Sequence, residues 1–409
     1  MIKIMASLPG MTRNFGNPLF QDTVKTTMSK VPKLKDRKVI LLATATITND
    51  NLFSNGLFQN VFILYRMFDA MGYAPVLVIH DKPKTLDNIP QMLHNARMMT
   101  TEEVILQPIP VIALIEIGMS IDPLLRQFVK MLGGKLVKLY LGNILNIDVE
   151  TPMFYPGMHF SHHVIEKIDK IWVSPHYGQH AEYASHINHV IAPANLNDMI
   201  APYVWDKSII RRDGLENIKW RPREAPEDDV FVIMEPNISF QKSSYIPLLA
   251  VEHWYRSTGR TWKGKVILVN GDRITNTPHF TQSVEPYLDI FKDNRVQVHE
   301  RMDIHTVLKT YPSAIFILHQ VNNEYNYMTL ELLECGFPAI HNSEAWSSFG
   351  YSYSGNNVKE ASEQIDAAYE LHSERLEMYK AHTETLKWRH SPYNPDVHAA
   401  WESLLNSKV

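Results

Sequence analysis

The chain alternates between short apolar runs and longer stretches whose apolar residues follow helical spacing. Residues 39–45 (VILLATA) have the composition of a buried strand, and residues 56–71 place Leu57, Val61 and Leu64 on one helical face. Residues 74–79 (APVLVI) form the next apolar run. Strands separated by helices run parallel, because each helix carries the chain back to the start of the sheet. The pattern therefore predicts an α/β protein built on parallel sheets.

The alternation occurs twice, on either side of a polar stretch that contains tryptophan and proline. In the first half we expect strands at 39–45, 74–79, 111–117, 135–141, 168–174 and 189–192, and helices at 56–71 and 124–131. In the second half we expect strands at 230–234, 265–270, 296–299, 314–319 and 339–341, and helices at 243–257, 304–310 and 358–382. A further helix holds Glu331, and a short one at 394–405 ends the series.

The length of the chain favours two domains, because 409 residues exceed what one hydrophobic core usually supports. We expect a Rossmann-like N-terminal domain at 1–200, a connector at 201–228 and a second Rossmann-like domain at 229–385. The segment 386–409 is expected to pack back on the first domain. The predicted fold is thus two doubly wound α/β domains facing a cleft, with ligands at the carboxyl ends of the strands.

The composition is that of a soluble globular enzyme, with 45% hydrophobic and 21% charged residues. The formal net charge of −4 argues against broad, nonspecific binding to nucleic acid. The single cysteine, Cys335, excludes an intrachain disulfide and a cysteine-rich metal site. We expect no transmembrane segment, because residues 104–121, the longest apolar stretch, contain Gln107, two prolines and Glu116. The N-terminus lacks a long apolar core, so we expect a cytoplasmic protein.

Residues 323–338 (NEYNYMTLELLECGFP) are the most informative motif. A short polar loop leads into an apolar, helix-patterned segment in which Glu331 follows Asn323 by eight residues, and Gly336 and Pro338 end the segment. The first amides of a helix are unpaired and favour anions, so such a loop can bind a diphosphate. A carboxylate one or two turns into the helix can then accept hydrogen bonds from ribose hydroxyls. Taken alone, the motif also fits an ordinary amphipathic helix with an acidic outer face.

This motif resembles the donor site of the two-domain GT-B glycosyltransferases, which use nucleotide sugars. In that family two carboxylates separated by seven residues are followed by Gly-x-Pro; Glu331 matches the second carboxylate, with Gly336 and Pro338 at the family offset. Asn323 stands where the first carboxylate is expected, with Glu324 beside it. The resemblance covers roughly residues 38–385. It extends to a group of bacterial and viral glycosyltransferase-like proteins through residues 56–60 (GLFQN).

Three further segments match the family in order, and the resemblance assigns each a part of the donor site. Residues 234–242 (MEPNISFQK) resemble a strand and loop that end in a phosphate-binding lysine, here Lys242. Residues 296–311 resemble the strand, base-contact loop and short helix that place Arg301 and Met302 near the nucleobase. Residues 168–174 and 190–197 resemble the last two strands before the interdomain hinge.

Four other positions and one histidine complete the predicted site. Asn55 and Gly56 match the glycine loop that faces the donor phosphates and the acceptor. Thr329 and Leu330 are expected to contribute backbone amides to the diphosphate. His319 ends a strand beside the donor loop, where a substrate contact and a structural role are equally open.

The catalytic base stays open. Many GT-B relatives carry a histidine or aspartate after the strand that corresponds to residues 135–141, and this chain has Asn143 nearby instead. An amide binds but cannot act as a general base, so Asn143 is a binding candidate. Glu116, at the end of the preceding strand, is the nearest ionisable alternative, and a capping or solvent-exposed role for it is equally open. Metal-independent catalysis without a tightly bound cofactor is expected, since helix amides and a cationic side chain can neutralise the leaving diphosphate. The 19 histidines form no HExxH-type motif.

The resemblance implies a hexosyl- or pentosyltransferase that moves a sugar from a nucleotide-diphosphate sugar, such as a UDP-sugar, to a hydroxyl acceptor. The matched donor motif favours retention of the anomeric configuration. The acceptor is a saccharide or a hydroxymethylated base in duplex DNA, as in viral DNA modification. A noncatalytic nucleotide- or sugar-binding relative of the same fold is the alternative, and the missing first acid is what it predicts. The sequence leaves the oligomeric state undetermined.

Overall fold

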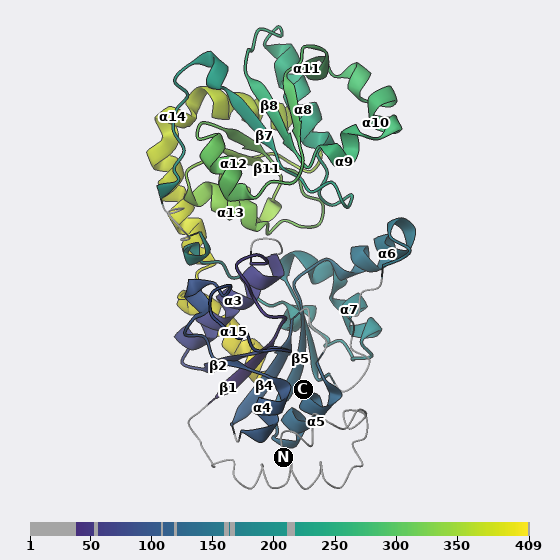
Figure 1. Cartoon of the computed structure of the whole chain (residues 1–409), viewed down its shortest axis with the longest axis vertical. Coiled ribbons are helices and arrows are strands. Elements are labelled where there is room, and N and C mark those ends of the chain that lie inside the picture. Colours follow the sequence, from purple (N-terminus) through teal and green to yellow (C-terminus); the bar gives the residue numbers. More distant parts are fainter. Residues whose placement is uncertain are drawn as a thin grey trace. The chain divides into compact units, whose positions relative to one another are not determined.

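The computed structural model describes residues 38–52, 56–107, 109–117, 121–158, 163, 168–210 and 217–407 (Figure 1). These residues form two compact units. Unit 1 comprises the described residues up to Trp205 together with those from His390 onward, and unit 2 is Asp206–Arg389. The chain therefore leaves unit 1 once, forms unit 2 as one continuous segment, and returns.

Unit 1 is built on a parallel sheet of six strands in the order β3-β2-β1-β4-β5-β6. The strands are β1 Val39–Ala43, β2 Ala74–Val78, β3 Met98–Met99, β4 Val111–Glu116, β5 Lys135–Tyr140 and β6 Lys170–Val173. Every residue of β1 is buried, as expected for a central strand that is covered on both faces. The strand order reverses between β1 and β4, and such switch points are where open α/β sheets bind ligands.

The helices of unit 1 lie on both faces of its sheet (Figure 1). They are α3 Gly56–Ala70, α4 Thr101–Leu106, α5 Pro123–Met131, α6 Ile144–Phe154, α7 Ala181–Ile187 and α15 Pro395–Asn406. Local sequence signals start several of them. Thr100 and Glu103 form a reciprocal capping box at α4, and the Asp122 side chain accepts from the Leu124 N–H at α5, where Pro123 has no N–H that would need an acceptor.

The last helix, α15, completes the core of unit 1. The ring of Trp401, 1% exposed, packs edge-on against Phe68 of α3 and Trp172 of β6, with ring centroids 5.5 and 5.7 Å apart. The Tyr73 hydroxyl donates to Glu402 at 2.7 Å. Segments more than 200 residues apart in sequence thus share one hydrophobic core.

Unit 2 repeats the same topology with the strand order β12-β11-β10-β7-β8-β9. Its strands are β7 Val230–Ile233, β8 Lys265–Val269, β9 Val296–His299, β10 Ile315–Ile317, β11 Ala339–His341 and β12 Tyr351–Ser352. Its helices are α8 Tyr245–Ser257, α9 Asp272–Thr275, α10 Pro278–Ser283, α11 Asp289–Lys292, α12 Ile304–Thr310, α13 Tyr327–Glu334 and α14 Val358–Arg389. The order reverses between β7 and β10, which places the switch point of this sheet there.

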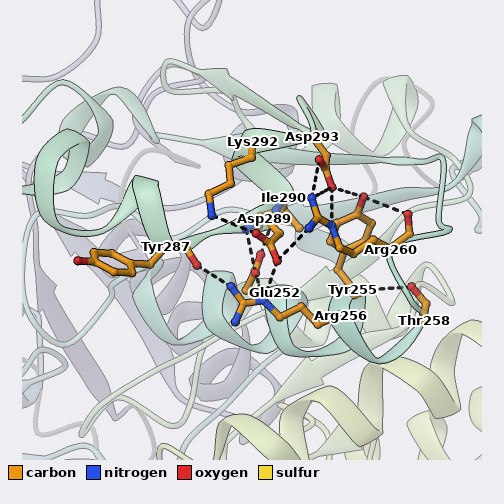
Figure 2. Close-up of polar contacts among 10 residues, drawn as sticks. All are labelled: Glu252, Tyr255, Arg256, Thr258, Arg260, Tyr287, Asp289, Ile290, Lys292 and Asp293. Atoms are coloured by element: carbon orange, nitrogen blue, oxygen red, sulfur yellow. Dashed lines mark hydrogen bonds and ion pairs between the residues drawn. The ribbon is translucent and has the colours of Figure 1, made fainter.

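A polar cluster holds α8 against the short helix α11 (Figure 2). Buried Glu252 accepts from the first two amides of α11, those of Asp289 and Ile290, at 2.9 and 3.0 Å. A buried carboxylate at a helix N-terminus satisfies amides that have no partner within the helix. Arg256 pairs with both Glu252 and Asp289, so the charge of each carboxylate is balanced locally.

Most of the predicted elements occur, and two differ. Residues 189–192, predicted as a strand, form none: Ile191 is 94% exposed and Pro193 follows directly, so these residues neither bury an apolar face nor continue a ladder. The helix predicted to end at His382 continues as α14 to Arg389, because the next proline is Pro392. Within the described residues, no helix is both long and apolar enough to cross a membrane.

Candidate functional site

The switch point of unit 2 holds a buried carboxylate. Glu235 follows β7 and is 0% exposed, and residues after the neighbouring strand β10 surround it. The His319 N–H donates to Glu235 Oε1 at 3.0 Å, and Gln320 Nε2 donates to Oε2 at 2.8 Å. Because β7 and β10 are parallel neighbours, their carboxyl ends bring these residues together at one edge of the sheet.

The environment of Glu235 disfavours its charged form. Burial raises the pKa of the Glu235 carboxyl to about 7, although the His319 amide, Lys242 and Gln320 each oppose the rise. Hydrogen bonds and a nearby cation stabilise a carboxylate but do not here compensate for the loss of water. A buried carboxyl with a raised pKa at the switch point of a parallel sheet is a candidate functional group.

Lys242 is the cation that acts on Glu235. Burial lowers the pKa of the Lys242 ammonium, and the charge of Glu235 opposes that change. The lysine ends a tight loop in which the Asn237 N–H donates to the Lys242 carbonyl at 3.1 Å and the Lys242 N–H donates to Ser239 at 3.2 Å. The structure thus places Lys242 in a loop after β7, and its phosphate-binding role stays a prediction.

Asn237 fixes this loop to the neighbouring strand. Its backbone has a φ of 54°, in the left-handed region that asparagine tolerates better than most residues. Its side-chain oxygen accepts from the Ser244 N–H at 2.9 Å, and its Nδ2 donates to the Asn270 carbonyl at 3.1 Å. Asn270 and Asn322, in the loops after β8 and β10, also have positive φ angles of 57° and 50°. Three loops at this edge of the sheet thus contain an asparagine in a backbone conformation that most other residues avoid.

His319 is a neutral, buried side chain at this edge. Burial lowers the pKa of the His319 imidazole to about 4, and a side-chain hydrogen bond with Asn356 opposes the change. Its Nδ1 lies 2.9 Å from the Tyr353 hydroxyl. That hydroxyl donates to the Leu318 carbonyl at 2.8 Å, so Nδ1 carries the proton and donates to it. His319 therefore offers hydrogen bonds rather than charge near neutral pH.

The donor motif forms α13 and the loop before it. Asn326 caps the helix by accepting from the Met328 N–H at 3.1 Å, and Gly336, with φ of 75°, ends the segment in a conformation that favours glycine. Glu331 lies on the second turn and is 5% exposed, so it is a buried carboxylate rather than part of an acidic outer face. Thr329 and Leu330, on the turn before it, are buried as well.

The loop before α13 contains the two polar residues of the motif. Asn323 Nδ2 donates to Gln320 Oε1 at 2.7 Å, which joins the motif to the Glu235 network. Glu324 accepts from the Ala345 N–H at 3.2 Å through Oε2. Arg301 and Met302 lie in a separate loop after β9, the edge strand of this sheet, where Arg301 is exposed and Met302 half-buried.

In unit 1 the structure gives each catalytic candidate a defined partner. Glu116, 1% exposed at the end of β4, receives hydrogen bonds from Arg126 Nε at 2.6 Å and Nη2 at 3.1 Å. Lys138 lies beside it in register on β5, and burial lowers the pKa of that lysine to about 8, with Glu116 opposing the change. Glu116 is thus a paired carboxylate. Asn143, 2% exposed, caps α6 by accepting from the Asn146 N–H at 3.3 Å.

The predicted glycine loop is described in part. Gly56 is the first residue of α3, and Asn55 lies outside the described residues. A second polar cluster follows β5: His163 contacts the Tyr140 hydroxyl through Nδ1 at 3.0 Å and Asp148 through Nε2 at 2.7 Å. Both of its ring nitrogens are therefore engaged, which is typical of a structural histidine. In the described part of the chain, no three His, Cys, Asp or Glu side chains gather as metal ligands would.

One known protein family matches this chain over most of its length. The model of the family described as "Protein of unknown function (DUF2827)" matches residues 41–405. The chain belongs to the DUF2827 family. No curated protein matches this DUF2827 sequence.

Two solved structures share the fold of this DUF2827 protein. An α-glucosyltransferase in complex with UDP and a 13-mer DNA containing an HMU base is 10% identical, with a TM-score of 0.51, and 90% of this chain aligns with 99% of that one. Anabaena HepE in complex with UDP and glucose is 10% identical, with a TM-score of 0.50, over 89% of this chain and 99% of that one. The predicted α/β fold of two Rossmann-like domains is confirmed, and the resemblance to GT-B glycosyltransferases holds at the level of the fold.

Proposed function

We propose that the protein is a glycosyltransferase that takes its sugar from a nucleotide-diphosphate sugar, and that the switch point of unit 2 is the donor site. One observation supports the proposal: Lys242 lies close enough to Glu235 to act on its pKa, and the loop that leads into α13 joins Glu235 through Gln320 and Asn323. A GT-B donor site needs a carboxylate for the ribose, a cation for the diphosphate, and helix amides beside them.

Most of the predicted contacts have a defined chemical role in this proposal. Glu331 accepts hydrogen bonds from the ribose hydroxyls, and Lys242 neutralises the diphosphate as the bond to the sugar breaks. The Thr329 N–H already donates to the Asn326 carbonyl at 3.2 Å, so the predicted contact of this amide with the diphosphate is not kept. Arg301 and Met302 contact the nucleobase. His319, which is neutral, donates or accepts a hydrogen bond at the sugar side. Transfer then proceeds through an oxocarbenium-like state without a bound metal.

We propose a UDP-sugar as donor, because the two similar structures are an α-glucosyltransferase in complex with UDP and HepE in complex with UDP and glucose. The acceptor is a hydroxyl of a saccharide or of a hydroxymethylated base in duplex DNA, and the negative formal charge of −4 favours the saccharide. Retention of the anomeric configuration is part of the proposal, since the donor motif is that of retaining relatives. Asn143 binds on the acceptor side.

A noncatalytic nucleotide-sugar-binding protein is the second candidate, and two observations favour it. Asn323 stands where relatives have an acid, and Glu116 is held by Arg126 in a two-point ion pair. Both oxygens of the Glu116 carboxylate are thus engaged by Arg126 rather than presented to a substrate.

Turnover of a donor panel separates the two candidates. Purified protein is incubated with UDP-, GDP-, ADP- and dTDP-sugars, with and without saccharide or hydroxymethylated duplex DNA, and released nucleoside diphosphate is measured. We expect acceptor-dependent release from one UDP-sugar, and loss of release in Glu331→Ala. Binding of the nucleotide sugar without any release would support the noncatalytic candidate, and absence of binding to every donor would refute both.

A further inference from the structure

A chain of hydrogen bonds joins a buried carboxylate to the residue that replaces the first acid of the donor motif. Gln320 Nε2 donates to Glu235 Oε2 at 2.8 Å, and Gln320 Oε1 accepts from Asn323 Nδ2 at 2.7 Å. Glu235, Gln320 and Asn323 are 0%, 7% and 9% exposed. Water therefore has little access to these bonds, and each buried polar atom depends on its protein partner.

Further hydrogen bonds hold the backbone of His319 and Gln320 in place. The His319 N–H donates to the second oxygen of Glu235 at 3.0 Å. Asn342 bonds Gln320 twice, accepting from its N–H at 2.9 Å and donating to its carbonyl at 2.7 Å. The Gln320 side chain thus starts from a fixed backbone position and ends on a fixed carboxylate.

When Glu235 is ionised, it fixes which end of each side-chain amide in this series of hydrogen bonds is the donor. A carboxylate only accepts hydrogen bonds, so Gln320 must turn its NH₂ group toward Glu235 and its oxygen toward Asn323. Asn323 must then turn its own NH₂ group toward Gln320. The Oδ1 and Nδ2 atoms leave Cγ in different directions, so the same contact directs Oδ1 away from Gln320. An asparagine on a uniform polar surface has no such preference between its two ends.

We propose that Glu235 is a positioning residue that, through Gln320, orients Asn323 so that its carbonyl oxygen takes the place of the missing donor-site carboxylate. The inference rests on the proposed donor site for the identity of the ligand, a hydroxyl of the transferred sugar. The first acid of the family motif acts as a hydrogen-bond acceptor. A correctly turned asparagine supplies the same acceptor without a charge, whereas a reversed one would present an N–H donor, so that the sugar hydroxyl would have to accept instead of donate.

The first test is made on the wild-type protein by NMR at pH 8, where Glu235 is ionised. Side-chain amide signals are assigned by their disappearance in Asn323→Asp and Gln320→Glu. We expect slow hydrogen exchange for one Asn323 side-chain proton, compared with the exposed side chain of Asn276. Equal exchange rates at Asn323 and Asn276 would overturn the inference, whether or not the protein binds any nucleotide.

The second test exchanges the two partners. Glu235→Gln removes the directing charge, whereas the double variant Glu235→Gln/Gln320→Glu restores a carboxylate that accepts from both neighbours. In the double variant the new glutamine at 235 accepts from the His319 N–H and donates to the new glutamate, which accepts from Asn323. Glu374→Gln on α14, an exposed position, is the matched control for loss of one negative charge.

Binding of UDP-glucose and of UDP to these variants is measured by calorimetry. We expect Glu235→Gln to lower the ratio of UDP-glucose to UDP affinity by about two- to tenfold, the value of one hydrogen bond, and the double variant to recover it. A folded Glu235→Gln protein with an unchanged ratio, or a folded double variant that does not recover, would refute the positioning role. If wild-type protein bound neither UDP-glucose nor UDP, the proposed donor site would be refuted. The hydrogen-exchange rate of the Asn323 side chain would still decide how Asn323 is oriented.

Discussion

Replacement of Glu235 by glutamine is expected to stabilise the protein at alkaline pH and to have little effect on stability in acid. Burial raises the pKa of Glu235 from its ordinary value of 4.5 to about 7. The folded chain therefore keeps this proton over a pH range in which the unfolded chain has released it. The stabilisation from the bound proton is complete below about pH 4.5 and is lost as the pH rises through 7.

The size of the effect follows from the shift. The pKa difference between 4.5 and about 7 corresponds to about 3 kcal/mol of unfolding free energy at 1.36 kcal/mol for each pH unit. Glutamine keeps the shape of the side chain and carries no charge at any pH. The variant is thus expected to gain most of this energy at pH 8, which is about 6–12 °C in melting temperature for a unit of this size.

Melting temperatures of wild-type protein and Glu235→Gln are compared by calorimetry at half-unit steps from pH 4.5 to 8.5. The difference should be small at the acid end, increase between pH 5 and 7, and level off above. Glu374→Gln, at an exposed position, serves as the charge-matched control. A difference between variant and wild type that does not change with pH would show that Glu235 ionises normally and refute the reasoning.

Three further outcomes are expected. Lys242→Met should weaken UDP binding by about 10- to 100-fold, the value of hydrogen bonds to a charged group. Because burial lowers the pKa of Lys242 below its ordinary value of 10.5, wild-type affinity for UDP, measured by calorimetry, should decrease with rising pH before an ordinary lysine loses its proton, and the affinity of the variant should not. Glu331→Gln should weaken UDP binding by a similar factor with no change in melting temperature larger than a few degrees; unchanged affinity would contradict its ribose role. Glu252→Gln should lower the unfolding free energy by about 1–3 kcal/mol, because the amides of Asp289 and Ile290 lose a charged acceptor, while leaving UDP affinity unaltered; a melting temperature equal to that of wild type would count against the importance of the cluster in Figure 2.

The sequence predicts the layers of this fold well because periodicity is a local property. The apolar run after Lys38 becomes β1, and the spacing from Gly56 onward becomes α3. Glu331 and Lys242 could also be singled out, since their motifs lie in continuous segments. The prediction of a strand at 189–192 was wrong because an apolar triplet contains no information on whether a sheet edge is available beside it.

Glu235 and Gln320 are functional candidates that the sequence does not reveal, and the reason is physical. They lie on different loops, and only the adjacency of β7 and β10 brings them together. The signal in the sequence is weak: an acidic residue directly after an apolar strand, in the same segment as the more conspicuous Lys242. The sequence did not predict the partner of Glu116 either, because Arg126 lies on α5 and meets Glu116, at the end of β4, only in the folded protein.

The return of the chain to unit 1 through α15 has a practical consequence for protein engineering. Because Trp401 fills the core between Phe68 and Trp172, a truncated chain that ended at Trp205 would expose two large aromatic rings and lose part of its interior. Unit 2 is different: it is an uninterrupted insert, and the residues that precede and follow it, Trp205 and His390, are joined by a backbone hydrogen bond of 2.8 Å. The second half can therefore be exchanged between relatives as one cassette with adjacent ends, whereas the first half can only be exchanged in two pieces.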